Sequence, residues 1–225
     1  MTIAPAIPSA SVILMREGER SPEILLVQRN TKIVFHGGSW VFPGGKVDEA
    51  DAKALEKGDD LAIARRAGVR EVDEEAGLQI DGDTLVPFSH WTTPENQPKR
   101  FAAWFFIGIV GADHDVTVDG SEIVDHRWVT VDEALNQRFS NEIALAPPAF
   151  VSLLRIREFN AAEAILEHIV AGGAQRFSPR IVELDDGRCS VYAEDVAYES
   201  LDLTEPGPRH RLRMVKSGWQ YIDHF

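Results

Sequence analysis

The chain has 225 residues, of which 44% are hydrophobic and 26% are charged, a composition that excludes a disordered or fibrous protein. Its 36 acidic and 23 basic residues give a net charge of −13, which disfavours a nucleic-acid polymer as a partner. A single cysteine, Cys189, excludes an intrachain disulfide and a multi-cysteine zinc site. The length exceeds that of a typical domain of ~150 residues, which predicts one domain with an extension.

Neither end of the chain suggests targeting. The first basic residue is Arg16, so the positively charged start of a secretory signal is missing. The longest strongly apolar run covers residues 101–112, which is shorter than the ~20 residues needed to span a bilayer. We therefore expect a cytoplasmic protein that does not associate with membranes.

The first half of the chain predicts two strands, a glycine-rich loop and one long helix. Apolar runs at residues 11–15 and 23–28 are typical of strands, and residues 37–45 follow as the glycine-rich segment. Asp59 or Asp60 is expected to cap a helix that ends at Ala76, with Gly77 in the left-handed conformation that terminates it.

The second half predicts strands, then helices, then strands again. Thr130 and Glu133 have the spacing of a capping box and predict a short helix. Prolines 147 and 148 open a helix that runs to about residue 159, and another runs from residue 161 to the glycines at 172–173. Strands are expected at residues 85–92, 101–110, 126–130, 180–184, 189–193, 209–215 and 219–222. These elements predict an α/β (α+β) fold in which helices cover a mixed sheet.

Three carboxylates mark the first long helix. Glu74 and Glu75 follow Glu71 by three and four positions, so all three share a face, roughly opposite the apolar face of the helix. Carboxylates this close repel one another unless a cation lies between them, and oxygen ligands suit Mg²⁺ or Mn²⁺. The alternative is a solvated acidic helix face, which is the commoner meaning of such a pattern.

The surroundings of these glutamates resemble a known pattern. Residues 70–78 match R-E-U-x-E-E-x-G-U, the second half of the Nudix box, where U is aliphatic. The preceding Phe42-Pro43-Gly44-Gly45 resembles the loop that opens the same box. The family pattern places thirteen residues between its glycine and its arginine, whereas twenty-four separate Gly45 from Arg70, an insertion of eleven. The sequence therefore resembles the Nudix hydrolases, with an interrupted box.

The insertion obscures the first glutamate of the box, which supports the arrangement of loop and helix in the family. The position eight residues before Arg70 is Ala62, which cannot replace a carboxylate. The open candidates are Glu49, Glu56, Asp59 and Asp60.

The resemblance implies a Nudix-like mixed sheet sandwiched between helices, with a core at about residues 10–149 and a helical and β extension over residues 150–225. It also implies divalent-metal-dependent hydrolysis of a nucleoside diphosphate linked to another group. By motif position, Glu71, Glu74 and Glu75 are the Mg²⁺ or Mn²⁺ ligands, and Arg70 anchors the catalytic helix through a charge pair, for which Glu74 is a candidate. Gly44 and Gly45 would let the backbone approach the diphosphate.

The base that activates water often comes from a loop or strand outside the helix in this family. Glu122 is the first candidate here, with Glu142 and Glu95 as alternatives.

Two further segments resemble coenzyme A diphosphatases. Leu25, Leu26, Arg29, Gly38 and the F-P-G-G loop fit a pattern found in those enzymes, although Val34 replaces a basic residue. Residues 91–94, W-T-T-P, precede Arg100 as in the subgroup with an interrupted box. Coenzyme A or an acyl derivative is thus the favoured substrate, with Arg29 and Arg100 as phosphate ligands. Arginines 209, 211 and 213 alternate, so as a strand they share one face. A solvated face is the favoured expectation, and contact with a phosphate or a partner subunit is the alternative.

Other functions stay open. Hydrolysis of ADP-ribose, NADH or another dinucleotide is the nearest alternative, and a catalytically silent Nudix-fold ligand-binding module belongs to another class. The family resemblance also makes a homodimer an expectation.

Overall fold

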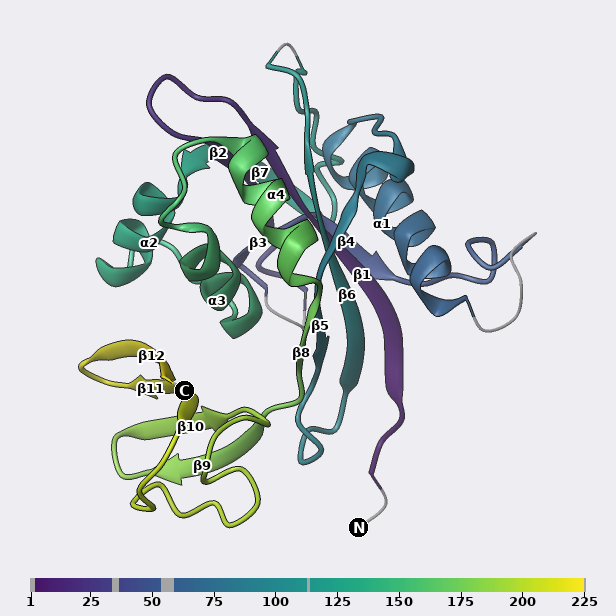
Figure 1. Ribbon diagram of the computed structural model, residues 1–225. Coiled ribbons are helices and arrows are strands. Elements are labelled where there is room, and N and C mark those ends of the chain that lie inside the picture. The colour runs from purple at the N-terminus through teal and green to yellow at the C-terminus, as the bar shows by residue number, and fades with distance from the viewer. Residues whose placement is uncertain (1–2, 34–36, 54–58, 113, 225) are drawn as a thin grey trace. The chain divides into compact units, whose positions relative to one another are not determined.

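The computed structural model describes residues 3–33, 37–53, 59–112 and 114–224 (Figure 1). The chain forms two units. The larger comprises Ile7–His90 and Ala103–Gln175, and the smaller comprises Met1–Ala6, Trp91–Ala102 and Arg176–Phe225. The expected division into a core of residues 10–149 and an extension of residues 150–225 stays a prediction.

Most strands belong to one eight-stranded sheet. Its main path has the order β3-β2-β1-β6-β5-β8, while β4 pairs with β1 and β7 pairs with β2. The strands are β1 (Ala6–Arg16), β2 (Glu23–Arg29), β3 (Trp40–Val41), β4 (Gly44–Lys46), β5 (Val86–Thr92), β6 (Arg100–Ile109), β7 (Ile123–Thr130) and β8 (Gln175–Phe177).

Strand β1 shows why the central strands read as continuous apolar runs. Val12 and Leu14 pack into the core cluster that α1 (Asp60–Ala76) also joins. Ile13 and Met15 alternate with them, point to the opposite face and are equally buried. Helix α1 lies on one side of the sheet, and α2 (Val131–Phe139), α3 (Pro147–Ile156) and α4 (Ala162–Gly172) lie on the other (Figure 1). The predicted α+β fold class is confirmed.

Helix α1 begins and ends where its sequence predicts. The Asp59 side chain caps it by accepting a hydrogen bond from the Ala62 amide, and Gly77 ends it at φ 66°. The apolar face includes Val72 and Ala76, which are fully buried, but Glu75 is also buried, at 4% exposure. The helical pattern predicts a carboxylate face directed away from the core. In the structure this face adjoins the core, because Glu75 is buried.

Strands β3 and β4 were not predicted, because the glycine-rich segment reads as a loop. In β4, Gly44 pairs with Ser11 and Gly45 with Ala10 in β1. A Cβ atom on Gly44 would lie 2.3 Å from the Ala10 carbonyl oxygen, so only glycine permits this close approach. The glycine there is explained by the contact between two backbones.

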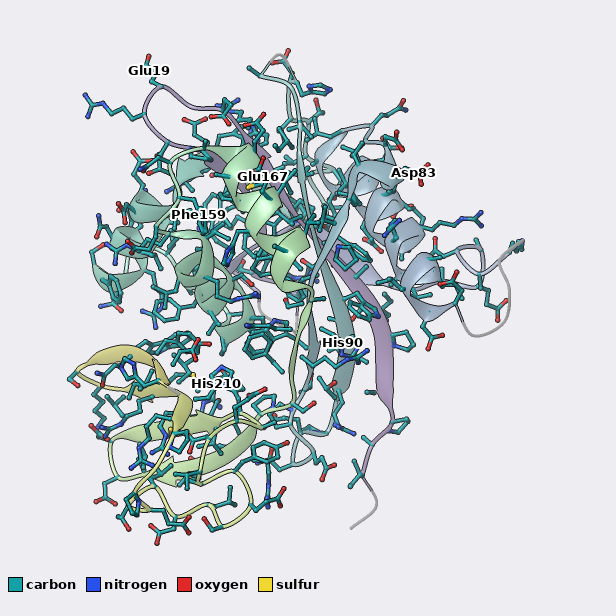
Figure 2. All side chains as sticks on the ribbon, viewed as in Figure 1. Glu19, Asp83, His90, Phe159, Glu167 and His210 are labelled. Carbon is teal, nitrogen blue, oxygen red and sulfur yellow. The ribbon has the colours of Figure 1, made fainter. Side chains whose placement is uncertain are left out.

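The smaller unit contains a four-stranded antiparallel sheet with the order β12-β11-β10-β9. Its strands are β9 (Arg180–Leu184), β10 (Gly187–Val191), β11 (Arg209–Val215) and β12 (Gly218–His224), close to the predicted ranges. The expected solvated arginine face is wrong for Arg211, which is buried and paired with Asp195. His210 (Figure 2) is buried between Glu194 and Tyr221, at 2.6 and 2.8 Å from their oxygen atoms.

The remaining features concern a short turn and the lengths of the helices. A 3-10 turn, η1 (Gly82–Thr84), separates α1 from β5. Among the described residues, no helix combines the length and the apolar character that crossing a membrane requires.

Candidate functional site

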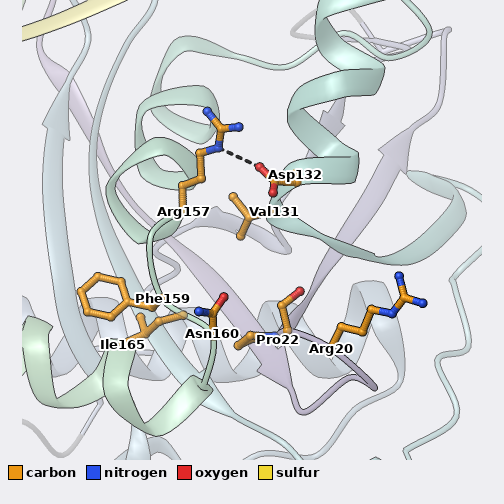
Figure 3. Close-up of a pocket in the computed structure, with 9 residues that line it drawn as sticks. Arg20, Pro22, Val131, Asp132, Arg157, Phe159, Asn160 and Ile165 are labelled. Carbon is orange, nitrogen blue, oxygen red and sulfur yellow. Dashed lines mark hydrogen bonds and ion pairs between the residues drawn. The ribbon is translucent and has the colours of Figure 1, made fainter.

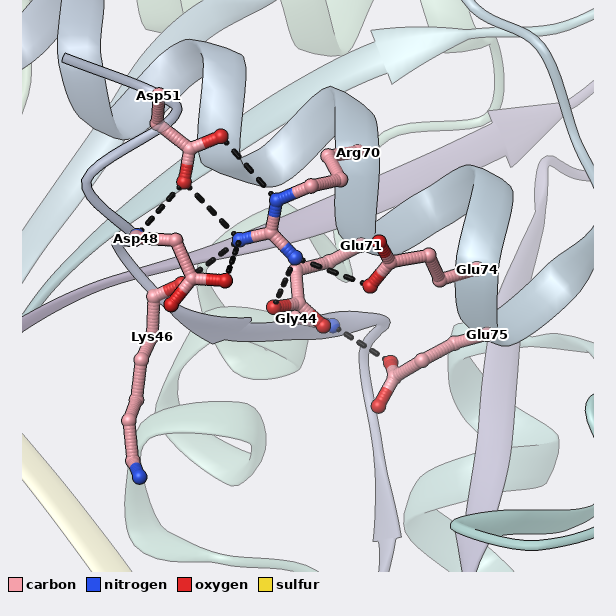
Figure 4. A network of polar contacts seen from close by, with 8 residues as sticks. All are labelled: Gly44, Lys46, Asp48, Asp51, Arg70, Glu71, Glu74 and Glu75. Atoms are coloured by element: carbon pink, nitrogen blue, oxygen red, sulfur yellow. Dashed lines mark hydrogen bonds and ion pairs between the residues drawn. The ribbon is translucent and has the colours of Figure 1, made fainter.

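An arginine–aspartate pair joins helix α1 to the loop after β4 (Figure 4). Arg70 donates to both carboxylate oxygens of Asp51, at 3.1 Å from Nε and 3.0 Å from Nη2. Asp51 also accepts a hydrogen bond from the Asp48 amide at 2.8 Å, and its side chain is only 5% exposed. Burial works to raise the pKa of Asp51, but the hydrogen bonds from Arg70 and Asp48 outweigh it and lower that pKa. The pair is therefore charged at neutral pH.

The same guanidinium holds two glutamates of the helix. Arg70 Nη1 lies 2.8 Å from Glu71 Oε1 and 3.0 Å from Glu74 Oε2, and Nη2 donates to the Lys46 carbonyl at 2.9 Å. The expected charge pair between Arg70 and Glu74 is present, although Asp51 is the more extensive partner. One side chain thus links β4, the following loop and the carboxylate face of α1.

Sequence reasoning missed Asp51. Of the proposed candidates, Glu49 is exposed, Asp59 caps α1 and Asp60 is exposed in its first turn. Glu56 lies outside the described residues, as does Val34. The signal was nevertheless there: the box places its first glutamate six positions after the glycine, and six positions after Gly45 is Asp51. The spacing from Arg70 does not identify Asp51, because eighteen residues separate the two where the family pattern has seven.

Two backbone positions of the glycine loop meet two glutamates of the helix. The Gly44 amide donates a hydrogen bond to Glu75 Oε2 at 2.8 Å. A Cβ atom on Gly45 would lie 2.3 Å from Glu71 Oε1, so the Glu71 carboxylate occupies the place that a side chain would take. Gly44, Gly45, Glu71 and Glu75 are therefore brought together.

When both are ionised, the two glutamates carry negative charge that the protein compensates only in part. Burial, together with the nearby Glu71 and Glu122, raises the pKa of Glu75 to about 8, although the Gly44 amide and Arg29 work to lower it. Burial likewise raises the pKa of Glu71, against the hydrogen bond from Arg70. Buried carboxylates with raised pKa values are favourable places for a cation.

The donor atoms of this arrangement, which are carboxylate oxygens, suit a hard divalent ion. Glu71 and Glu75 both present carboxylate oxygens to the Gly44–Gly45 backbone, and oxygen donors suit Mg²⁺ or Mn²⁺. Glu74 is directed toward Arg70 and its side chain is 59% exposed. Across the described ranges, no three His, Cys, Asp or Glu side chains form a ready-made metal cluster. The expected ligand set of Glu71, Glu74 and Glu75 thus stays a prediction.

Two residues from outside the helix also belong to this region. Arg29, at the end of β2, forms an ion pair with Glu122, whose side chain is 53% exposed. Glu122 acts electrostatically on both Glu71 and Glu75, and Arg29 acts on Glu75. Arg29 Nε is buried and has no hydrogen-bond partner among the described residues. Within the described part of the chain, the structure therefore leaves one donor of Arg29 without a partner.

The structure does not group every predicted residue with this region. Arg100 belongs to the smaller unit, where it donates to the Thr93 and Ala4 carbonyls at 3.0 and 2.8 Å, so its binding role stays a prediction. Glu142 pairs with Arg127 at 3.3 Å, and Glu95 belongs to the smaller unit.

A pocket of about 210 Å³ lies elsewhere in the larger unit (Figure 3). It is lined by the β1–β2 loop, the start of α2 and the α3–α4 loop, and includes the Arg157–Asp132 ion pair at 2.7 Å. None of the predicted site residues lines it.

Comparison with known proteins places this geometry in a family. The family model described as NUDIX domain matches residues 5–149. Nudix hydrolase 7 of Caenorhabditis elegans is 28% identical over 185 residues, which is 67% of this chain and 60% of that protein. The acyl-coenzyme A diphosphatase NUDT19 of Xenopus laevis is 32% identical over 128 residues, 53% of this chain and 34% of that protein. The chain thus spans less than two thirds of the length of these curated relatives.

Solved structures share the fold. A NUDIX hydrolase from Alicyclobacillus acidocaldarius superposes with a TM-score of 0.67 at 21% identity, covering 74% of this chain and 97% of that one. The NUDIX domain of Shewanella oneidensis NrtR, solved in complex with ADP-ribose, gives a TM-score of 0.52 at 14% identity, covering 69% and 88%.

The glycine loop generates a first prediction. In Gly45→Ala the new methyl group displaces the flexible Glu71 carboxylate but not the backbone, so folding survives while the cation site is distorted. We expect Mn²⁺ affinity, measured by electron paramagnetic resonance titration, to fall about tenfold or more, the cost of one misplaced ligand. The control is Gly172→Ala, where a Cβ meets nothing within 4 Å. Equal Mn²⁺ affinity in all three proteins would contradict the prediction.

The raised pKa of Glu75 generates a second prediction, for protein freed of divalent ions. A carboxyl group with a pKa of about 8 in the folded state, against 4.5 unperturbed, holds its proton more tightly when folded. Stability is therefore lost as pH rises between those values. Glu75→Gln removes this loss, and we expect it to raise the free energy of unfolding by up to about 4 kcal/mol near pH 8.5 and far less near pH 5.

Urea unfolding at the two pH values measures the difference. The matched control is Asp73→Asn, which removes one exposed carboxylate from the same helix. A Glu75→Gln effect that is the same at both pH values would show that Glu75 titrates normally in the folded protein.

Proposed function

This chain belongs to the Nudix hydrolase family, and on that premise we propose that it hydrolyses the diphosphate bond of a nucleoside diphosphate derivative. One observation carries the proposal: the Glu71 and Glu75 carboxylates are buried against the Gly44–Gly45 backbone with their charge only partly compensated. A surface helix whose acidic face was merely solvated would not bury Glu75 to 4% exposure. Nor would it raise the pKa of that residue.

The carboxylates would hold the metal. Glu71 and Glu75, with Glu74 beside them, would bind Mg²⁺ or Mn²⁺, which when bound neutralises charge on the phosphoryl oxygens and orients water. Arg70 keeps the helix and the loop in place through Asp51 and is a positioning residue. Gly44 and Gly45 let the Glu75 and Glu71 carboxylates lie against the backbone, and their binding of the diphosphate itself stays a prediction.

The reaction requires a proton acceptor, and the position of Glu122 suits that role. It is more than half exposed and lies within electrostatic range of Glu71 and Glu75. Water forms a bond from its oxygen to one phosphorus, the bridging P–O bond breaks, and Glu122 takes the proton from the attacking water. The products are two phosphate monoesters. Arg29, with its unsatisfied Nε, would contact the negative oxygens of the substrate.

Coenzyme A or an acyl-coenzyme A is the substrate that we propose. Support comes from the F-P-G-G loop, the W-T-T-P segment and the Xenopus laevis relative named as an acyl-coenzyme A diphosphatase. Hydrolysis at the diphosphate would release 3′,5′-ADP and a phosphopantetheine. ADP-ribose and NADH are the competing substrates, and they would release AMP.

A hydrolysis panel tests the proposal. We expect the protein, with Mg²⁺ or Mn²⁺, to cleave coenzyme A or acyl-coenzyme A faster than NADH or ADP-ribose, with products identified by mass. Glu75→Gln is expected to lower kcat/KM by about a thousandfold, since it removes a metal ligand and a charge from the reacting centre. Asp73→Asn, one exposed carboxylate on the same helix, is expected to stay within about twofold.

The outcomes separate the two levels of the proposal. Cleavage of ADP-ribose without coenzyme A would overturn only the substrate. Absence of cleavage of all compounds, together with unchanged Mn²⁺ binding in Glu75→Gln, would overturn the hydrolase activity and favour a ligand-binding module.

A further inference from the structure

The turn that carries Glu122 is organised by a single carboxylate. Asp119 Oδ1 accepts hydrogen bonds from the Ser121 amide at 2.5 Å, the Glu122 amide at 2.7 Å and the Ser121 hydroxyl. Asp119 Oδ2 accepts a fourth bond, from the Ile123 amide at 2.9 Å. Three successive backbone amides are therefore held by one side chain.

The other side of the turn is held by Asn30. Its amide donates to the Glu122 carbonyl at 2.8 Å, and its side chain donates to the Ser121 carbonyl at 2.9 Å. Both backbone polar groups of Glu122 thus have fixed partners. Because Asn30 directly follows Arg29, these bonds also place Glu122 beside the guanidinium with which it pairs.

The turn is closed at Gly120. Gly120 adopts φ +73°, and its amide donates to the Ile123 carbonyl at 2.9 Å, which closes the loop tightly. Burial works to raise the pKa of Asp119, but the hydrogen bonds from residues 121–123 outweigh it and lower that pKa. Asp119 is thus an anion at neutral pH, and charge strengthens each of its hydrogen bonds.

We propose that Asp119 is a positioning residue that fixes the backbone of Glu122, so that the Glu122 carboxylate is held beside Arg29 and within range of Glu71 and Glu75. The inference rests on the proposed function, because it gives Glu122 its task. Asp119 itself does not touch the reacting atoms. Its side chain is engaged by residues 121–123, so it acts through the place at which Glu122 is presented.

Graded variants test the inference. Asp119→Ala removes all four acceptor bonds, and we expect kcat to fall about tenfold to a hundredfold, the effect of a misplaced reacting group. Asp119→Asn keeps one carbonyl oxygen at Oδ1 and is expected to retain several times more activity than Asp119→Ala. In both variants KM and Mn²⁺ affinity are expected to stay within about twofold, because the metal ligands are on α1. The control is Asp115→Ala, which removes an exposed carboxylate from the same loop.

A double variant separates positioning from general support of the fold. If Asp119 acts only through Glu122, then adding Asp119→Ala to Glu122→Gln lowers kcat by less than about twofold further. Amide hydrogen exchange at residues 121–123 is expected to accelerate about tenfold or more in Asp119→Ala, with the Gly77 amide at the end of α1 unchanged.

Three results would overturn the inference. They are unchanged exchange at residues 121–123, unchanged kcat in Asp119→Ala, and a loss in the double variant equal to the product of the single losses. In each case the parent activity stands, so the proposed function survives. A parent protein that cleaves none of the compounds in the hydrolysis panel would overturn both, since Glu122 would then have no reaction to assist.

Discussion

The contact between Arg70 and Asp51 is the interaction on which the rest of the site depends. An insertion of eleven residues separates the two halves of the Nudix box along the chain, and this pair joins them again in space. Because the same guanidinium also binds Glu71, the pair determines where the helix presents its carboxylates relative to the glycine loop. An insertion of this length is tolerated since the contact does not depend on the path of the chain between the two residues.

The glutamates of the site lie in surroundings that disfavour their ionised forms. Glu71 and Glu75 lie largely out of water, and among the described residues the Arg70 side chain, Arg29 and the Gly44 amide favour their ionised forms. A bound divalent ion would favour the ionised form of both carboxylates and reverse the local sign where the proposed diphosphate substrate would bind. The net charge of −13 is thus compatible with an anionic small-molecule substrate, although it disfavours a nucleic-acid polymer.

Much of the fold and part of the candidate site could be predicted from the sequence. Helix α1 was predicted well because its start and end are encoded locally, by Asp59 and by Gly77. Strand β4 was missed because its glycines are explained by the approach of β1, a contact that no local pattern records. Asp51 was missed because the insertion removed its spacing from Arg70. The hydrogen bonds of Asp119 depend on side-chain geometry within a turn, which the spacing of residues in the sequence does not indicate.

The most direct test of the central claim is a double-mutant cycle between Asp51 and Arg70, measured as the free energy of urea unfolding. The single variants are Asp51→Ala and Arg70→Ala, and the same cycle with Asp48, whose carboxylate is 66% exposed at 3.8 Å from Arg70, serves as the control. We predict a coupling of about 2 kcal/mol or more between Asp51 and Arg70, and of less than about 0.5 kcal/mol between Asp48 and Arg70. Equal couplings for the two aspartates would contradict the account.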